Sequence, residues 1–133
     1  MSYIEQELEK LDFKFIKYKD TIYGHRPVVY CYLNRRTELI DYIGSTGDMV
    51  HRLYQRLNKK ETSIPFDKYY REHRAEYELY LLRICSTREE AYEYENKFIK
   101  LIKPKYNFNC NPYNQIKLKE KQLVNANDYY DLN

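Results

Sequence analysis

The sequence predicts an α+β domain with three strands and flanking helices. Two runs rich in β-branched and aromatic residues, at 28–33 and 39–44, are joined by a polar turn at 34–37 and therefore indicate a β-hairpin. A third apolar run at 77–85 indicates a further, more buried strand. Apolar residues that recur three or four positions apart outside these runs indicate the helices.

The N-terminal part, residues 1–27, is predicted to be a helical arm. Apolar residues alternate with charged ones at helical spacing within residues 2–11. Phe13 and Phe15 then alternate with lysines, a pattern that fits either a strand or an extended segment. Both alternatives stay open from the sequence alone.

Two helical segments are expected between the hairpin and the third strand. Asp48 is a residue type that caps helices, and helical spacing of apolar residues carries the first segment to about residue 58. After a break at 62–65, residues 66–73 form a short aromatic and charged helical turn.

The most clearly delimited helix follows the third strand. Ser86 or Thr87 begins it, because Glu89 and Glu90 lie three residues after those two hydroxyls and complete alternative capping boxes. The helix runs toward Pro104, which cannot extend it.

The chain is thus divided into the arm, a central domain at 28–107 and a C-terminal tail at 108–133. The tail is rich in Asn, Lys and Tyr, and we expect it to be loosely docked, with at most a short helix near 115–124. A length of 133 residues leaves room for one core, so a single domain must hold both the fold and the site.

Composition narrows the functional classes. A net charge of +3 permits a nucleic-acid partner without demanding one. No apolar run approaches the roughly 18 residues that cross a bilayer, and the charged N-terminus lacks the apolar segment of a signal peptide. We therefore expect no membrane association and a cytoplasmic location, or a nuclear one in a eukaryotic or viral source.

The cysteines and aromatic residues point to ordinary core packing or to stacking on bases. Cys31, Cys85 and Cys110 are odd in number and too widely spaced for a zinc clamp, and we expect Cys31 and Cys85 to be core thiols. Seventeen tyrosines without a tryptophan supply aromatic faces for nucleobases, but they serve half-buried strands and helices equally well.

Glu95 is the clearest local anomaly. It shares a helical face with apolar residues such as Ala91 and Phe98, and not with the charged positions of the same helix. A partly buried carboxylate requires a cation, a metal or several donors. Glu95 is therefore either a salt-bridge partner or a metal ligand.

Two further groups of residues are candidates for phosphate contact. Tyr30 and Tyr42 lie in the hairpin, and Gly44 allows close backbone approach just before a helix whose N-terminal amides are unpaired donors. Arg52 and Arg56 lie one turn apart on the same side of that helix, where they fit either a solvated face or a phosphate.

Together these segments resemble the GIY-YIG nuclease domain. The matching features are the strand that ends in Tyr30, an intact Tyr-Ile-Gly-Ser-Thr at 42–46, Arg52, the helix that carries Glu95, and Pro-Lys-Tyr-Asn at 104–107. The resemblance spans about residues 28–107.

The resemblance implies a three-stranded antiparallel sheet flanked by helices and a metal-dependent endonuclease that hydrolyses DNA phosphodiesters. It implies that Glu95 holds a single divalent cation, Mg²⁺ or Mn²⁺, as suits a carboxylate and a hard ion. Arg52 would clamp the phosphate, Tyr30 would orient or deprotonate the attacking water, and Tyr42 would hold the phosphate or the water network. Gly44, Ser45, Thr46, Arg56 and Asn107 would contribute to substrate binding.

Two departures from the family pattern bear on this hypothesis. Val28 and Val29 stand where the family has Gly-Ile, which keeps the strand intact. Arg56 stands where many members have a histidine or tyrosine, often treated as a proton acceptor, and a guanidinium cannot act as a base. The alternative is therefore a catalytically silent nucleic-acid-binding module of the same fold. The form of DNA (duplex, branched or single-stranded) and the choice between homodimer and targeting partner stay open.

Overall fold

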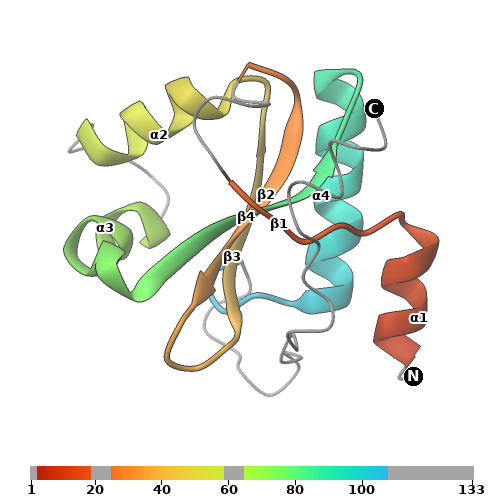
Figure 1. Cartoon of the computed structure of the whole chain (residues 1–133), viewed down its shortest axis with the longest axis horizontal. Coiled ribbons are helices and arrows are strands. Elements are labelled where there is room, and N and C mark those ends of the chain that lie inside the picture. Colours follow the sequence, from red (N-terminus) through yellow and green to blue (C-terminus); the bar gives the residue numbers. More distant parts are fainter. Residues whose placement is uncertain (1–2, 19–24, 59–64, 108–133) are drawn as a thin grey trace.

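The computed structural model describes residues 3–18, 25–58 and 65–107. The tail expected at 108–133, its short helix near 115–124 and most of the break at 62–65 lie outside these ranges. Within them the chain forms one antiparallel sheet with helices on both faces (Figure 1).

The sheet has four strands in the order β1-β4-β2-β3, and all neighbours are antiparallel. The strands are β1 (Ile16–Lys17), β2 (Val28–Asn34), β3 (Ile40–Thr46) and β4 (Tyr77–Ile84). The hairpin and the third strand confirm the sequence prediction.

The fourth strand, β1, corrects the expected count of three. It holds only two residues, with Ile16 opposite Leu81, and the amides of Lys14 and Tyr18 extend the contact to carbonyls of β4. Two residues are too few to give a period, so the pairing is set by the neighbouring edge of β4. The alternation of Phe13 and Phe15 therefore leads into a strand.

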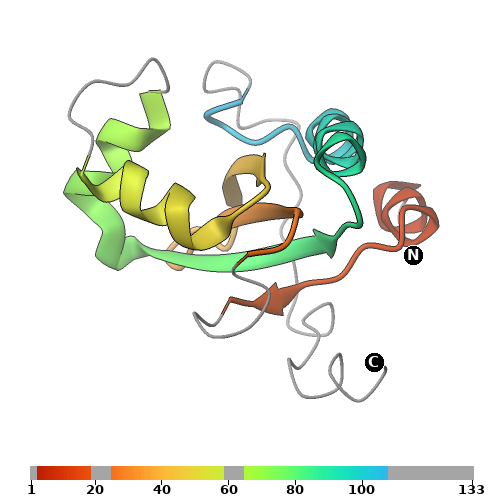
Figure 2. The ribbon, with the colours of Figure 1, turned by 90° about the horizontal axis from the view of Figure 1, so that it is seen from above.

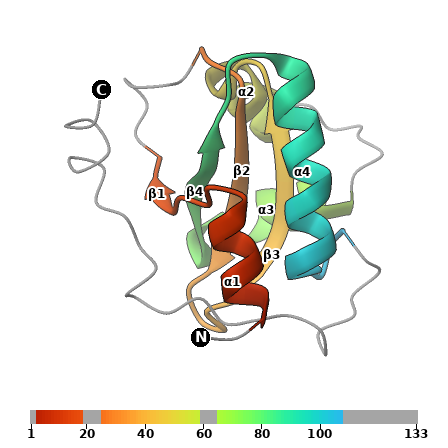
Figure 3. The same ribbon diagram turned by 90° about the vertical axis from the view of Figure 1, so that its right-hand side faces the viewer.

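Helices cover the two faces of the sheet in separate pairs. One face carries α1 (Tyr3–Lys10) and α4 (Arg88–Ile102), which lie in front of the strands in Figure 3. The other carries α2 (Met49–Asn58) and α3 (Pro65–His73), the latter followed by the short 3₁₀ helix η1 (Arg74–Glu76). Seen from above, the sheet lies between these two pairs of helices (Figure 2).

Two cores result from the alternation of side chains along β2. Val29 and Cys31 point toward α1 and α4, where they join aliphatic residues and Phe98. Tyr30 and Tyr32 point the other way and pack with the aromatic residues of α3. Most of the tyrosines that the structure describes belong to this second core, and Cys31 and Cys85 are buried free thiols, as expected.

The helix boundaries follow from capping side chains. Thr87 Oγ1 accepts from the Glu90 amide at 3.1 Å, and Glu90 Oε2 accepts from the Ser86 amide at 3.1 Å. Lys103 ends α4 in the left-handed region at φ 53°. Asp48 Oδ1 accepts from the His51 amide at 3.0 Å and caps α2. Among the described residues, no helix combines the length and the apolar character that crossing a bilayer requires.

Candidate active site

The candidate residues converge on β3, which is an edge strand of the sheet. Tyr30, Tyr42 and Arg52 approach it from the face covered by α2 and α3, whereas Glu95 approaches from α4 on the other face. The two groups act on each other electrostatically, since the charges of both Arg52 and Glu95 affect the ionisation of Tyr42. The structure therefore brings together the four residues proposed to be catalytic.

Gly44 lies directly beneath the side chain of Tyr30, its cross-strand neighbour. A Cβ added at Gly44 would stand 2.5 Å from the Tyr30 hydroxyl oxygen and 2.7 Å from Cζ. The close approach that this glycine permits is therefore made by Tyr30, and Gly44 is buried where we expected it to face a phosphate. The requirement is steric, because Gly44 has no positive φ.

Tyr42 is half-buried and held by a parallel stack on Phe66, with ring centroids 4.9 Å apart and planes 3° apart. Burial raises the pKa of Tyr42 to about 12, and the nearby Tyr30 adds to this effect. Arg56 and Arg52 oppose the shift, while Glu95 reinforces it. The Tyr42 hydroxyl is therefore protonated, and able to donate a hydrogen bond, at any pH near neutrality.

Asp67 on α3 ties the two arginines of α2 together. Its side chain is 3% exposed, and it binds Arg56 Nε at 2.5 Å and Arg52 Nη2 at 3.4 Å. Arg52 keeps 17% of its side chain exposed, whereas Arg56 keeps none. The expectation that the two arginines share one side of the helix is confirmed.

Arg56 is fully buried, which corrects both alternatives drawn from the sequence, a solvated face and direct contact with a phosphate. Its guanidinium lies 5.1–5.8 Å from the ring centroids of four aromatic residues: Tyr30, Tyr32, Tyr42 and Phe66. Nη1 donates to the Tyr30 hydroxyl oxygen at 3.1 Å. α3 closes over this side of α2, so the arginine acts inside the protein, on Tyr30.

Glu95 is partly buried, and its Oε1 accepts a hydrogen bond from Ser45 Oγ at 2.8 Å. Burial raises the pKa of Glu95, while hydrogen bonds from Ser45 and the charge of Arg88 counter that shift. Within the described part of the chain Glu95 forms no ion pair. The salt-bridge alternative therefore finds no support there. The hydrogen bonds from Ser45 and the charge of Arg88 do not fully offset the cost of burying the charged carboxylate, which therefore remains undercompensated.

Thr46 and Asn107 bind the backbone of this region. Thr46 Oγ1 accepts from the Asp48 amide at 3.1 Å in the turn that leads into α2. Asn107 Oδ1 accepts from the Ile43 amide at 2.9 Å, and Asn107 Nδ2 donates to the Ile43 carbonyl at 3.0 Å. Both side chains thus hold the site together in this structure, where we expected them to contact substrate.

Asp67 and Arg88 are residues of the site that the sequence analysis missed. Arg88 begins α4 and donates to Ser45 Oγ at 2.9 Å, which links it to Glu95. The unmatched pair Arg52 and Arg56, with no acidic residue in α2, was a signal that a carboxylate must come from elsewhere. No comparable signal distinguished Arg88 from other arginines.

His51 and His73, the histidines of α2 and α3, make their contacts away from Tyr30. His51 is exposed on α2 and contacts Gln55, and His73 stacks on Tyr69 at the end of α3. No group of three or more metal-ligating His, Cys, Asp or Glu side chains occurs in residues 3–18, 25–58 and 65–107. A metal at this site would therefore depend on Glu95, with water and phosphate as further ligands.

Comparison with known proteins agrees with this arrangement. Residues 26–107, more than half of the chain, match the model of the GIY-YIG catalytic domain. No curated protein and no solved structure gives a significant match. The matched segment contains the hairpin tyrosines, Arg52, Glu95 and Asn107, and nucleases with this domain act on DNA. The chain belongs to the GIY-YIG nuclease family.

Proposed function

We propose that this protein is an active, metal-dependent DNA endonuclease that hydrolyses phosphodiester bonds with a single Mg²⁺ or Mn²⁺ held by Glu95. The observation that carries the proposal is the meeting of an undercompensated carboxylate, Glu95, with the cluster of Tyr30, Tyr42 and Arg52 at the edge strand β3. Phosphodiester cleavage needs an activated water, relief of charge on the phosphoryl oxygens and stabilisation of the leaving oxygen.

The residues present fit a divalent cation. Glu95 offers carboxylate oxygens, the ligand type that Mg²⁺ and Mn²⁺ prefer, and burial disfavours its charge in the absence of a cation. Ser45 fixes one of these oxygens by hydrogen bonding, as expected for an oriented ligand. When bound, the cation would act as a Lewis acid on the phosphate and on water.

Arg52 is suited to hold the scissile phosphate. Its guanidinium is always charged and presents several donors, and Asp67 uses only one of them, Nη2, at 3.4 Å. This pairing restricts the orientation of the side chain before substrate arrives. The donors that Asp67 leaves unused can then stabilise the charge that develops on the phosphoryl oxygens.

The two tyrosines have different roles in this proposal. Tyr42 is protonated near neutral pH, so it donates a hydrogen bond to the phosphate or to the water network. Tyr30 is 1% exposed and accepts a hydrogen bond from Arg56, so its own hydroxyl proton is available to another acceptor. In this proposal that acceptor is the attacking water, which must reach the buried hydroxyl when substrate binds. Arg56 thereby acts through Tyr30 as a positioning residue, at the place where many family members have a histidine or tyrosine.

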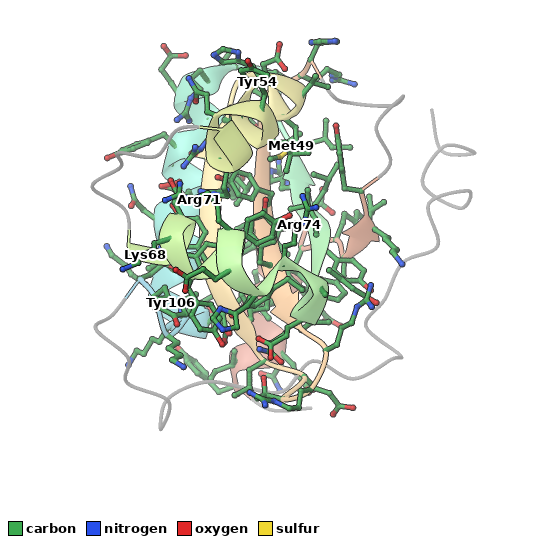
Figure 4. All side chains as sticks on the ribbon, turned by 90° about the vertical axis from the view of Figure 1, so that its left-hand side faces the viewer. Met49, Tyr54, Lys68, Arg71, Arg74 and Tyr106 are labelled. Atoms are coloured by element: carbon green, nitrogen blue, oxygen red, sulfur yellow. The ribbon has the colours of Figure 1, made fainter. Side chains whose placement is uncertain are left out.

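Three cations of α3 and η1 would support a DNA partner, although Asp67, Glu72 and Glu76 of the same stretch balance their charge. Lys68 and Arg74 are exposed, and Arg71 lies between them in sequence on the same short stretch (Figure 4). The phosphate backbone is recognised largely through such cations. This surface lies on the same face of the sheet as Tyr42 and Arg52.

A catalytically silent DNA-binding module is the second candidate, because one specific observation favours it. Arg56 replaces the common base position, and it is buried and paired with Asp67, so it has no route to accept a proton. Both candidates predict DNA binding that weakens with salt. Only the endonuclease predicts metal-dependent strand scission.

The deciding experiment incubates the protein with supercoiled plasmid, single-stranded DNA and a branched duplex in Mg²⁺, Mn²⁺ or EDTA. We expect the wild type to cleave at least one of them only with metal, and Glu95→Ala to be inactive. Glu93→Ala is the matched control, because Glu93 lies on the same helix, exposed and paired only with Lys97 in the described region. DNA binding without any cleavage by the wild type would favour the silent module.

A further inference from the structure

A hollow on the surface of α4 lies beside the candidate active site and has no role in the mechanism above. It has a volume of about 370 Å³ and is lined by Arg88, Glu89 and Tyr92. All three side chains are exposed, and the Tyr92 ring is among the large apolar groups left open to solvent, at 57% exposure. An exposed aromatic ring in a hollow is a common feature of ligand sites.

The hollow is connected to Glu95 through hydrogen bonds. Arg88 donates to Ser45 Oγ at 2.9 Å, and Ser45 Oγ in turn donates to Glu95 Oε1 at 2.8 Å. Arg88, Tyr92 and Glu95 are also spaced four and three residues apart, so they follow one side of α4. A ligand in the hollow would therefore lie next to the phosphate that Glu95 and its cation would bind.

The chemistry of the lining matches a nucleotide. The Tyr92 ring offers a face on which a base can stack, and the Arg88 guanidinium lies 5.9 Å from the centre of that ring. The Glu89 carboxylate can accept hydrogen bonds from the amino groups of bases, and Arg88 can pair with a phosphate. A base inside a duplex already has both faces stacked, so the occupant must be unpaired.

We propose that this hollow binds one unpaired nucleotide of the DNA strand being cut, next to the scissile phosphate. The inference rests on the proposed nuclease function and gives it a substrate preference, for DNA that is single-stranded, branched or frayed near the cut. Tyr92 is the stacking residue, Arg88 binds the adjacent phosphate, and Glu89 accepts from the base.

The absence of tryptophan from the chain allows a direct test. In Tyr92→Trp the single indole reports on its own surroundings, and a base stacked on it should quench its fluorescence. We expect at least twofold quenching when a single-stranded oligonucleotide is added in EDTA, where no cleavage occurs. An oligonucleotide of the same length in which every nucleotide is abasic should not quench the fluorescence, because the phosphates remain and the bases are gone. Tyr3→Trp, on exposed Tyr3 of α1, is the matched control and should show neither effect.

Kinetics supply an independent readout. Removal of one stacked base typically weakens binding about five- to 150-fold, so Tyr92→Ala should raise KM by this factor and leave kcat nearly unchanged. Tyr92→Phe keeps the ring and should restore the wild-type KM.

The outcomes separate failure of the inference from failure of the function. Metal-dependent cleavage without quenching of Tyr92→Trp, or with an unchanged KM in Tyr92→Ala, would overturn the nucleotide site and leave the nuclease intact. Equal quenching by free deoxynucleoside monophosphates at the same concentration would overturn the DNA strand as the occupant. If the wild type itself does not cleave DNA, this result would instead contradict the proposed function.

Discussion

The carboxylate of Asp67 on α3 forms a buried ion pair with Arg56 on α2, at 2.5 Å from Nε, inside a cage of four aromatic rings. The other oxygen of the same carboxylate reaches Arg52 at 3.4 Å. Asp67 lies outside both strands of the hairpin, and it therefore sets the positions of Arg52, which we propose to bind the phosphate, and of Arg56, which binds Tyr30.

Replacement of Asp67 by Asn should be severe, because it leaves the charge of Arg56 buried without an anion. Breaking a buried pair in this way costs about 3–5 kcal/mol of the free energy of unfolding. Urea unfolding checks the value, and Asp12→Asn is the control, since exposed Asp12 pairs with Arg83 at the surface and should cost less than about 1 kcal/mol.

A double variant separates the structural role of this pair from its role in catalysis. Arg56→Met with Asp67→Leu should recover most of the lost stability, because apolar residues often replace a buried pair without loss. Cleavage should stay low, since neither Tyr30 nor Arg52 is then held. Full activity in this double variant would contradict the positioning role of Asp67.

Gly44→Ala should destabilise the sheet, because the added Cβ would stand 2.5 Å from the Tyr30 hydroxyl and 2.7 Å from Cζ. Overpacking of this kind costs about 1–3 kcal/mol. Tyr30→Phe removes the nearest atom, so the loss caused by Gly44→Ala should be smaller in that background. Thermal unfolding of the four proteins of this cycle measures the coupling. Gly47→Ala is the control, because its Cβ would have its nearest neighbour at 3.7 Å.

Glu95 should make both activity and stability depend on pH. Burial raises the pKa of Glu95, so in the metal-free protein the carboxylate that we propose to bind the metal is protonated at a higher pH than an ordinary glutamate. At metal concentrations well below saturation the acid limb of the pH–rate profile should therefore follow the raised pKa of Glu95, and it should move to lower pH as the metal concentration rises, because the cation competes with the proton. The folded state binds this proton more tightly than the unfolded state, so stability is lost as pH rises through the folded-state pKa.

Glu95→Gln tests the sign of this effect. Above the folded-state pKa, in EDTA, the variant should be more stable than the wild type, and the difference should vanish in acid. Thermal unfolding between pH 4 and pH 8 provides the measurement. A variant less stable than the wild type at pH 8 would mean that the carboxylate is well compensated without a metal.

Tyr42→Phe should lower kcat by about a hundredfold, as does the loss of other transition-state hydrogen bonds. The ring should stay stacked on Phe66, so the thermal midpoint should change little. Because the pKa of Tyr42 is about 12, the pH–rate profiles of wild type and variant should be parallel up to about pH 11. If the wild-type pH–rate profile has a limb near neutral pH that is missing from the profile of the variant, Tyr42 would have a role in proton transfer.

Neutralising Lys68 of α3 and Arg74 of η1 should weaken DNA binding without changing chemistry. In Lys68→Gln with Arg74→Gln, affinity should fall for every sequence, and the salt dependence should lose up to about 0.9 in slope per phosphate contact removed. Fluorescence anisotropy at several salt concentrations measures this slope. Cleavage at saturating DNA should equal that of the wild type, and an unchanged slope would exclude this surface from the DNA path.

Local patterns in the sequence were sufficient to predict most of the fold. The hairpin, the third long strand and the capped helix α4 follow from alternation, turn residues and the Thr87 cap, which act over a few residues. β1 could not be predicted because its two residues join the sheet through the exposed edge of β4. The burial of Arg56 could not be predicted either, since α2 alone does not reveal that α3 closes over it.

Of the candidate site, too, the sequence could predict some residues and not others. Glu95 was recognisable because a carboxylate on an apolar helical face needs compensation. Asp67 was not, because its partners lie 11 and 15 residues earlier, on another helix. Gly44 was noticed for its freedom of approach, but only the register of β2 against β3 reveals that Tyr30 makes that approach.

The backbone of β3 also has a consequence for self-association. Edge strands with unpaired amides and carbonyls recruit strands from other chains and so promote aggregation or domain swapping. Here Tyr106 and Asn107 bind the outward groups of Asp41 and Ile43, and Arg88 reaches the Ser45 carbonyl at 3.4 Å. The segment that runs through α4 to Asn107 thus blocks this edge against intermolecular β-sheet growth.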